Sequence, residues 1–377
     1  MRTQDALASL GLALTIAVFM PDQVSATPAD RLTDTQTVEL TDKQKQVIAH
    51  RGASGYLPEH TLAAKAMAHA QGADFLEQDL VMTRDGEVVV LHDITLDATT
   101  DVAARFTDRA RADGKHYVID FTLDELRTLR VFERRNQSAA AVYPNRMRVK
   151  QARFGIHTLA EELEMIQALN RVTGHDAAIY PEIKAPRFHQ ENGQDLSEAT
   201  LNILKSYGYV KRDDGVVLQS FDARELQRIK GELMPALGVD LPLTQLLADP
   251  RWGASIGSPS DNEWQPEMLN TIATYADAVG VPVSMLFERG SDRNTGGQTS
   301  SALSTVISPS MLVPTAHRQG LAVHAYTLRA DRLPLSQGTL EDWHQWLFET
   351  AQIDGVFTDF PDLTVQYLNR TENTIKE

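Results

Sequence analysis

Cysteine is absent from this 377-residue chain. Its absence excludes disulfide bonds, thiolate catalysis, cysteine-ligated zinc and a cysteine lipid anchor. Positive charge is also scarce: 36 Lys and Arg face 51 Asp and Glu, the net charge is -15, and no long basic run occurs. No nucleic-acid partner is expected, because nucleic-acid phosphates are repelled by an acidic protein. A phosphate-bearing substrate would have to be held by a few placed cations or by a metal ion.

Long apolar runs are missing except near the start, where residues 7–20 are mostly apolar but too few to span a membrane comfortably. This stretch follows Arg2 and precedes the small residues Val24-Ser25-Ala26. The pattern predicts a secretory signal peptide over 1–26, followed by an N-terminal extension over 27–45. An anchoring or disordered N-terminus is the alternative. The mature protein is expected to be exported, without stable insertion into a membrane.

Short apolar runs alternate with amphipathic stretches along the rest of the chain. Strands are expected at 47–50, 73–83, 87–93, 179–184, 215–221, 282–287, 322–329 and 355–360. Helices are expected at 61–71, 158–171, 223–237 and 267–279. This alternation implies βαβ units and a parallel sheet.

About eight strand candidates suit the α/β class and a closed (β/α)8 TIM barrel, here expected as a single domain over 46–372. An open doubly wound sheet is the alternative, but no Gly-rich nucleotide-binding loop supports it. Residues 101–156 break the rhythm, with one clear helical stretch at 122–129. They are expected to form a small insertion after the early strands.

Polar residues stand at the ends of the expected strands. They are His50, Arg51, Glu77, Asp79, His92, Glu182, Lys184 and Gln219. In a TIM barrel these positions converge on the C-terminal mouth, where active sites lie. Glu77 and Asp79 share one strand face, as do Glu182 and Lys184, because residues i and i+2 point the same way. Three clustered carboxylates need a cation, and oxygen ligands favour Ca²⁺ or Mg²⁺ over zinc.

Each of these residues, taken singly, is more often structural than functional. A Glu-x-Asp pair can be a solvated face, Lys184 can form an ordinary ion pair, and Arg51 can brace a loop. The coincidence at four strand ends favours a site. The other histidines do not belong to this set of polar residues at strand ends, and most of them are expected to be structural. They are His60, His69, His157, His175, His189, His317 and His324.

Seven collinear motifs resemble the glycerophosphodiester phosphodiesterases, most closely their periplasmic bacterial branch. The motifs are HRGASGYLPEHT (50–61), GADFLEQDLVMTRDG (72–86), VVLHD (89–93), YPEIKAP (180–186), LQSF (218–221), VHAYTLR (323–329) and GVFTDFPD (355–362). The resemblance covers the chain from about residue 46 to near its C-terminus. It implies a TIM barrel with an insertion after the early strands.

The resemblance also implies roles for individual residues. His50 and His92 match the family's catalytic pair. The expected metal ligands are Glu77, Asp79 and Glu182, and the expected substrate-binding residues are Arg51, Lys184, Gln219 and Tyr326. His60 stands where many members have Asn, and it is not expected to be catalytic.

The implied activity is metal-dependent hydrolysis of glycerophosphodiesters, which are deacylated phospholipids, to glycerol 3-phosphate and an alcohol. Ca²⁺ is the expected ion, with Mg²⁺ as the second choice, and the expected location is the periplasm. A homodimer is compatible with the sequence. Attack by the substrate's own hydroxyl, through a cyclic phosphate, and direct attack by water both stay open.

Two other functions stay open as alternatives. A phospholipase acting on intact lipids would need an apolar rim on the mouth loops, whereas the loops at 255–265 and 289–301 are polar. A non-catalytic surface binding protein could use the same barrel, but the full set of site residues argues against it.

Overall fold

A computed structural model of the chain describes residues 45–148, 153–248, 266–289 and 307–376. The expected signal peptide, the expected extension up to residue 44 and the polar loop at 255–265 lie outside these residues. The second polar loop lies outside them as well, apart from Arg289. No helix in the described part of the chain is long and apolar enough to cross a membrane.

Eight parallel strands form a closed barrel, in which each strand pairs with the next barrel strand along the chain and the last pairs with the first. The barrel strands are β1 (Gln46–Ala49), β2 (Phe75–Met82), β4 (Ala178–Ile183), β5 (Leu218–Ser220), β6 (Leu243–Leu246), β7 (Ala278–Pro282), β10 (Ala322–Leu328) and β11 (Gly355–Thr358). The predicted (β/α)8 barrel is therefore confirmed, and the open sheet is wrong.

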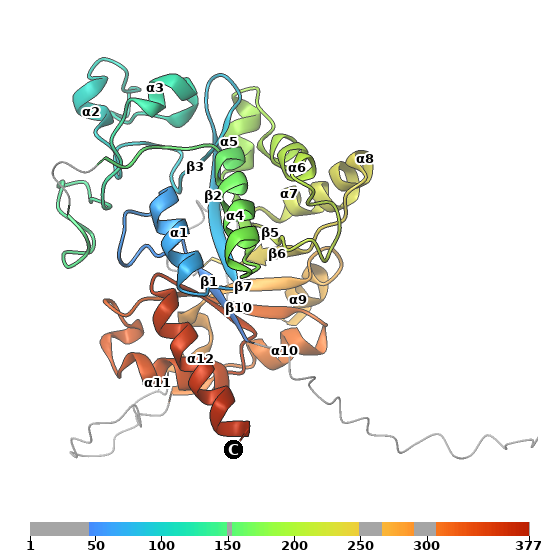
Figure 1. Cartoon of the computed structure of the whole chain (residues 1–377). Coiled ribbons are helices and arrows are strands. Elements are labelled where there is room, and N and C mark those ends of the chain that lie inside the picture. The colour runs from blue at the N-terminus through green and yellow to red at the C-terminus, as the bar shows by residue number, and fades with distance from the viewer. Residues whose placement is uncertain (1–44, 149–152, 249–265, 290–306, 377) are drawn as a thin grey trace, which may run out of the picture. The chain divides into compact units, whose positions relative to one another are not determined.

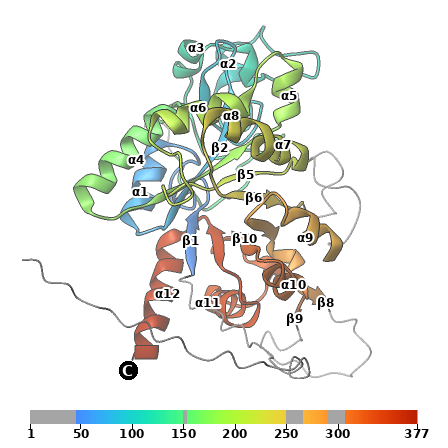
Figure 2. The same ribbon diagram turned by 90° about the vertical axis from the view of Figure 1, so that its right-hand side faces the viewer.

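Helices cover the outside of the barrel (Figure 1, Figure 2). They are α1 (Leu62–Ala70), α4 (Leu159–Thr173), α5 (Pro186–Glu191), α6 (Leu196–Ser206), α7 (Ala223–Arg228), α8 (Met234–Leu237), α9 (Pro266–Ile272), α10 (Leu312–Arg318), α11 (Leu340–Gln345) and α12 (Pro361–Lys376). Local signals fix their ends. Before α4, the Thr158 side chain accepts a hydrogen bond from the backbone N–H of Glu161, whose side chain accepts one from the backbone N–H of Thr158. Gly174 ends α4 with a left-handed φ of 73°.

Two predicted elements near the end of the barrel differ from the structure. The segment 282–287 is not a barrel strand: β7 already ends at Pro282, and Val283–Met285 is a turn of 3-10 helix. The helix expected at 267–279 ends at Ile272, because the residues from Ala278 onward are needed in β7. Strand β6 was not predicted at all, since LTQL is short and half polar.

The segment between β2 and α4 leaves the barrel. It contains β3 (Val88–Val90), which pairs antiparallel with β2, and then α2 (Val102–Arg105), a 3-10 turn at Val118–Asp120 and α3 (Leu123–Arg127). Both views show α2 and α3 side by side (Figure 1, Figure 2), and Figure 1 shows β3 on the same side of the barrel. This segment has its own small apolar core, which includes Leu96, Phe121 and Leu126. A separate two-stranded sheet follows β7, in which β8 (Phe287–Arg289) pairs antiparallel with β9 (Ile307–Pro309).

A fully buried ion pair joins α1 to α4 behind strand β2. Lys65 Nζ donates to Glu162 Oε1 and to the backbone carbonyl of Glu77, both at 2.6 Å. Glu162 is also hydrogen-bonded by Gln78 Nε2 at 2.8 Å and by His157 Nε2 at 2.6 Å. The pair therefore fixes the strand that carries the predicted metal ligands.

Replacing Lys65 with Met should lower the free energy of unfolding by about 3–5 kcal/mol, because Glu162 would be left as a buried charge without its cation. Urea denaturation measures the loss. The matched control is Arg127→Met, which breaks the exposed Arg127–Glu161 pair on α3 and α4 and should cost about 1 kcal/mol or less. Equal losses in the two variants would contradict the assignment.

Candidate active site

A cavity of about 790 Å³ opens at the C-terminal ends of the barrel strands. Every residue predicted to act in catalysis or to bind metal or substrate lines it: His50, Arg51, Glu77, Asp79, His92, Glu182, Lys184, Gln219 and Tyr326. The strand ends bring these residues together from positions up to 276 apart in the chain (Tyr326 − His50). Their convergence makes the cavity the candidate active site, while their individual roles stay predictions.

Three carboxylates crowd one side of the cavity. Strands β2 and β4 place Asp79 directly beside Glu182, and Glu77 lies two residues earlier on the same face as Asp79. Burial raises the pKa of Glu182 to about 8, and the neighbouring Asp79 adds to the shift. Burial and Asp79 likewise raise the pKa of Glu77 well above its usual value. Burial contributes most to both shifts, and repulsion between the carboxylates adds to it. A divalent cation bound among them would favour their ionised forms, so the donor set fits such an ion.

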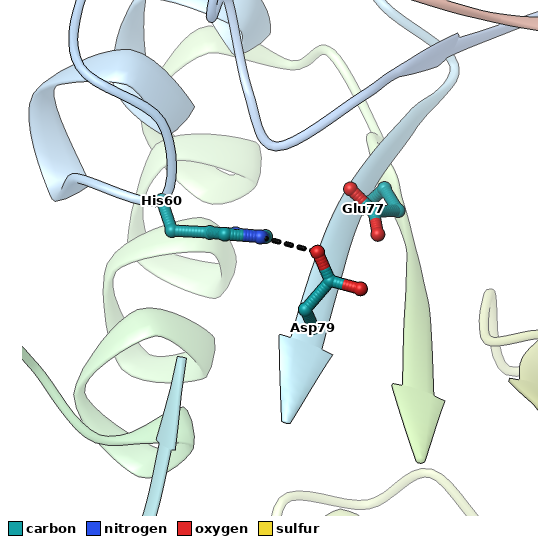
Figure 3. Close-up of side chains that lie close together, drawn as sticks. All are labelled: His60, Glu77 and Asp79. Carbon is teal, nitrogen blue, oxygen red and sulfur yellow. Dashed lines mark hydrogen bonds and ion pairs between the residues drawn. The ribbon is translucent and has the colours of Figure 1, made fainter. Parts of the chain in front are cut away.

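His60 stands behind this cluster and holds Asp79 in place (Figure 3). His60 Nε2, Glu77 and Asp79 lie close enough for their ligand atoms to share an ion. However, Nε2 is already hydrogen-bonded to Asp79 Oδ2 at 2.7 Å, and His60 is not among the residues that line the cavity. Burial lowers the pKa of His60 to about 4, so the neutral ring donates its N–H to the carboxylate. His60 thus orients Asp79, as outer partners of metal ligands commonly do.

The two predicted phosphate-binding cations lie against the same carboxylates. Lys184 Nζ is 2.9 Å from Glu182 Oε1 and 3.5 Å from Asp79 Oδ1. The Arg51 guanidinium is 3.0 Å from Glu59 Oε1 and 3.5 Å from Asp79 Oδ2. Both positive charges are therefore fixed at the wall of the cavity, where an anionic phosphodiester would meet them.

The turn after β1 explains how His50 and Arg51 reach the mouth. Arg51 has a left-handed φ of 60°, and its backbone N–H donates to Glu77 Oε2 at 2.6 Å. Gly52 follows with a φ of 82°, and a Cβ atom there would lie 2.7 Å from the backbone of Ala64. Only glycine fits this position, and the tight turn ends the strand at the two functional side chains.

His50 forms one of two pairs between an imidazole and a carboxylate. Its Nδ1 is 2.6 Å from Asp359 Oδ1, and Asp359 directly follows β11, the neighbour of β1. Burial lowers the pKa of His50 to about 4, and the positive charge of Arg51 contributes. The ring is thus neutral near pH 7, donates through Nδ1 and leaves Nε2 for a substrate. Asp359 lies in the motif GVFTDFPD (355–362), but no role was predicted for it from the sequence.

His92 forms the second such pair. Its Nδ1 is 2.5 Å from Asp93 Oδ1, the carboxylate of the next residue. Desolvation in the cavity and the positive charges of Arg51 and Lys184 lower the pKa of His92 to about 3. His92 is therefore also neutral near pH 7, with Nε2 free to take a proton from a substrate or, once protonated, to give one.

The far wall of the cavity is aromatic and apolar. Tyr326 packs edge-on to Phe221 and Phe357, with ring centroids 6.2 and 6.4 Å apart, and its hydroxyl donates to the backbone carbonyl of Leu247. Gln219 Nε2 donates to the carbonyl of Tyr180 at 3.3 Å, which leaves its buried Oε1 without a partner in the described structure. These contacts give the cavity one charged side and one apolar side.

Comparison with known proteins agrees with this geometry. Residues 50–363 match the model of the glycerophosphoryl diester phosphodiesterase family. The chain is 45% identical to a glycerophosphodiester phosphodiesterase of Haemophilus influenzae, with 86% of this chain and 90% of the relative covered. It is 38% identical to one of Treponema pallidum, with 87% and 92% covered.

The fold is shared with solved enzymes as well. A phosphodiesterase of Oleispira antarctica, solved in complex with the product sn-glycerol-3-phosphate, has a TM-score of 0.55 at 21% identity and covers 86% of this chain and 96% of that chain. The family model covers both imidazoles and all three carboxylates, and each of the two relatives is covered to 90% or more. On this evidence the chain belongs to the glycerophosphoryl diester phosphodiesterase family.

Proposed function

We propose that this enzyme hydrolyses glycerophosphodiesters to glycerol 3-phosphate and an alcohol, with His50 and His92 as its acid and base. The observation that carries the proposal is the cavity itself. Two imidazoles, each with a carboxylate on Nδ1, face the same space as three carboxylates and two fixed cations. Family membership and the named activity of the relatives support the same reaction.

A phosphodiester carries one negative charge and must lose an alkoxide. Arg51 and Lys184 lie where they can offset the charge. The aromatic wall formed by Phe221, Tyr326 and Phe357 can contact the carbon-bearing groups of the substrate on either side of the phosphate. One neutral imidazole takes the proton of the attacking hydroxyl, whether that hydroxyl belongs to water or to the substrate. The other imidazole protonates the departing alkoxide. Its pKa rises when the phosphate anion binds beside it, because a negative charge favours the protonated ring.

A divalent cation completes the site in this proposal, held by Glu77, Asp79 and Glu182. When bound there, it supplies positive charge for the phosphate oxygens and for the nucleophile. Ca²⁺ suits this set of carboxylates on two strands better than Mg²⁺, which demands near-ideal octahedral geometry. The structural support for an ion is the set of three carboxylates that face one cavity, two of them with raised pKa values.

We place the mature enzyme in the periplasm. The support is the signal-like segment at 1–26 in the sequence. In that compartment its substrates would be small glycerophosphodiesters released from degraded phospholipids.

Glycerophosphocholine and phosphatidylcholine vesicles separate the proposal from its alternatives. We expect release of glycerol 3-phosphate and choline from the first and no turnover of the second, measured by coupled assays for both products. The vesicle assay is informative because Leu335, at the rim of the cavity, leaves 36% of its surface exposed. Turnover of vesicles alone would favour a phospholipase, and turnover of neither would favour a binding protein.

A further inference from the structure

Two arginines from the segment between β2 and α4 contact the carboxylates that hold the two site histidines. The first is Arg146, which is nearly buried. Its guanidinium donates to Asp359 Oδ2 at 2.6 Å and makes a two-point contact with Asp331 at 2.8 and 3.0 Å. A third nitrogen donates to the carbonyl of Ser54 at 3.2 Å, and Tyr143 stacks on the guanidinium at 3.6 Å. Arg146 is thus locked on the far side of the carboxylate that holds His50.

The second is Arg134, which plays the same part for His92. Its NH1 donates to Asp93 Oδ2 at 2.6 Å. Its other two nitrogens donate to both oxygens of Glu59, at 2.6 and 3.0 Å, and Glu59 in turn accepts from Arg51 at 3.0 Å. Through Glu59, Arg134 therefore connects Asp93, which is bonded to His92, with Arg51 at the cavity wall.

We propose that Arg134 and Arg146 are positioning residues, through which the segment between β2 and α4 sets the orientation of both imidazoles. This role rests on the proposed function, because it concerns the same two histidines. In each case one carboxylate oxygen accepts from the imidazole and the other accepts from a guanidinium. Because the fork of an arginine is planar and charge-assisted, the carboxylate cannot rotate without breaking a strong contact. The ring bonded to it keeps its Nδ1–H donor and presents Nε2 to the cavity.

The two carboxylates differ in whether an arginine from outside this segment also holds them. Asp359 also accepts from Arg329 of the loop after β10, at 2.8 Å. For Asp93, the arginine contact in the described structure is that of Arg134 alone. Loss of Arg134 should therefore disturb catalysis more than loss of Arg146. It should also raise KM, because Arg51 loses the support of a fixed Glu59.

The test uses the variants Arg146→Met and Arg134→Met, with Arg111→Met as the matched control. Arg111 belongs to the same segment and makes a similar two-point contact, to Asp120 at 2.7 and 2.8 Å, but Asp120 is not the carboxylate that holds His50 or His92. With glycerophosphocholine as substrate, we expect kcat to fall about 10-fold in Arg146→Met, with KM unchanged, and about 100-fold in Arg134→Met, in the range for lost outer partners. Arg111→Met should match the parent enzyme. A kcat within twofold of the control in both arginine variants would overturn the proposal.

A spectroscopic measurement separates positioning from a general loss of structure, and it needs no turnover. In the substrate-free enzyme labelled with ¹⁵N-histidine, the Nδ1–H protons held by Asp359 and Asp93 should resonate far downfield. We expect the His50 signal to shift or broaden in Arg146→Met, and the His92 signal in Arg134→Met, each without change in the other. Unchanged signals in both variants would refute positioning even if kcat fell.

Two further outcomes are covered: a variant that does not fold, and a parent enzyme that does not hydrolyse the substrate. If Arg146→Met does not fold, Arg146→Lys replaces it, because lysine keeps the positive charge but lacks the planar fork of arginine. We expect a smaller fall in kcat and a shifted His50 signal. A His50 signal identical to that of the parent enzyme would overturn the proposal. If the parent enzyme does not hydrolyse glycerophosphocholine, the proposed function fails on its own. The histidine signals of the variants still decide the positioning role.

Discussion

Replacing His50 or His92 with alanine should lower kcat by about 10²–10⁴-fold, the usual contribution of a placed acid or base. Each ring is held by a carboxylate at Nδ1, which leaves Nε2 for proton transfer in the cavity. The folded structure should persist, because both side chains line the cavity rather than the apolar core. Steady-state kinetics, with thermal unfolding as the control for folding, measure the effect.

An activated substrate tells the two histidines apart. A nitrophenyl ester of glycerol phosphate has a leaving group that needs little protonation, so it should rescue the variant that lost the acid and not the variant that lost the base. The double variant should cost much less than the product of the single losses, because residues that act as a unit are not additive. Rescue of neither variant, or near-normal turnover by both, would place the acid and the base elsewhere.

Removing divalent cations should abolish activity, and Ca²⁺ should restore it. The expected loss is about 10³-fold or more, since a metal at a phosphate supplies several kcal/mol of charge stabilisation. Glu77→Gln should weaken metal binding more than substrate binding, because it removes one of three clustered carboxylates. Titration calorimetry with Ca²⁺ and assays in excess EDTA measure both effects. Full turnover at zero metal content would exclude the metal.

Binding of the ion should also depend on pH in a direction set by the same carboxylates. In the metal-free site burial and Asp79 raise the pKa of Glu182 to about 8 and raise that of Glu77 well above its usual value. Below about pH 8 a proton must therefore leave before the ion binds, so affinity should fall as the pH falls and level off above it. Calorimetry in two buffers of different ionisation enthalpy should detect proton release at pH 7. An affinity that does not change between pH 6 and 9 would contradict the assignment.

The sequence predicted the cavity well because its key residues obey local rules. Glu77 and Asp79 alternate with buried Leu76 and Leu80 on β2, so a period of two suffices to place them on one face. Strands β1, β2, β4, β5 and β10 then bring their polar residues to the same mouth. This is why side chains as distant in the chain as His50 and Tyr326 could be assigned to one cavity.

What the sequence did not reveal depends on partners that are distant in the chain. His50 and Asp359 are 309 residues apart, and Arg146 and Asp359 are 213 apart. No periodicity links such residues; only the closure of β11 on β1 and the folding of the segment between β2 and α4 bring them together. His60 was given no site role for a similar reason, because its hydrogen bond to Asp79 depends on the left-handed turn between β1 and α1.

A crystal structure of the enzyme grown with Ca²⁺ and glycerol 3-phosphate tests the central claim most directly. The account predicts an ion bonded to oxygens of Glu77, Asp79 and Glu182, with the phosphate beside it between Nε2 of His50 and Nε2 of His92. Anomalous scattering identifies the ion, and Arg51 and Lys184 should lie within hydrogen-bond distance of the phosphate. An ion bound away from the three carboxylates, or a phosphate out of reach of both imidazoles, would contradict it.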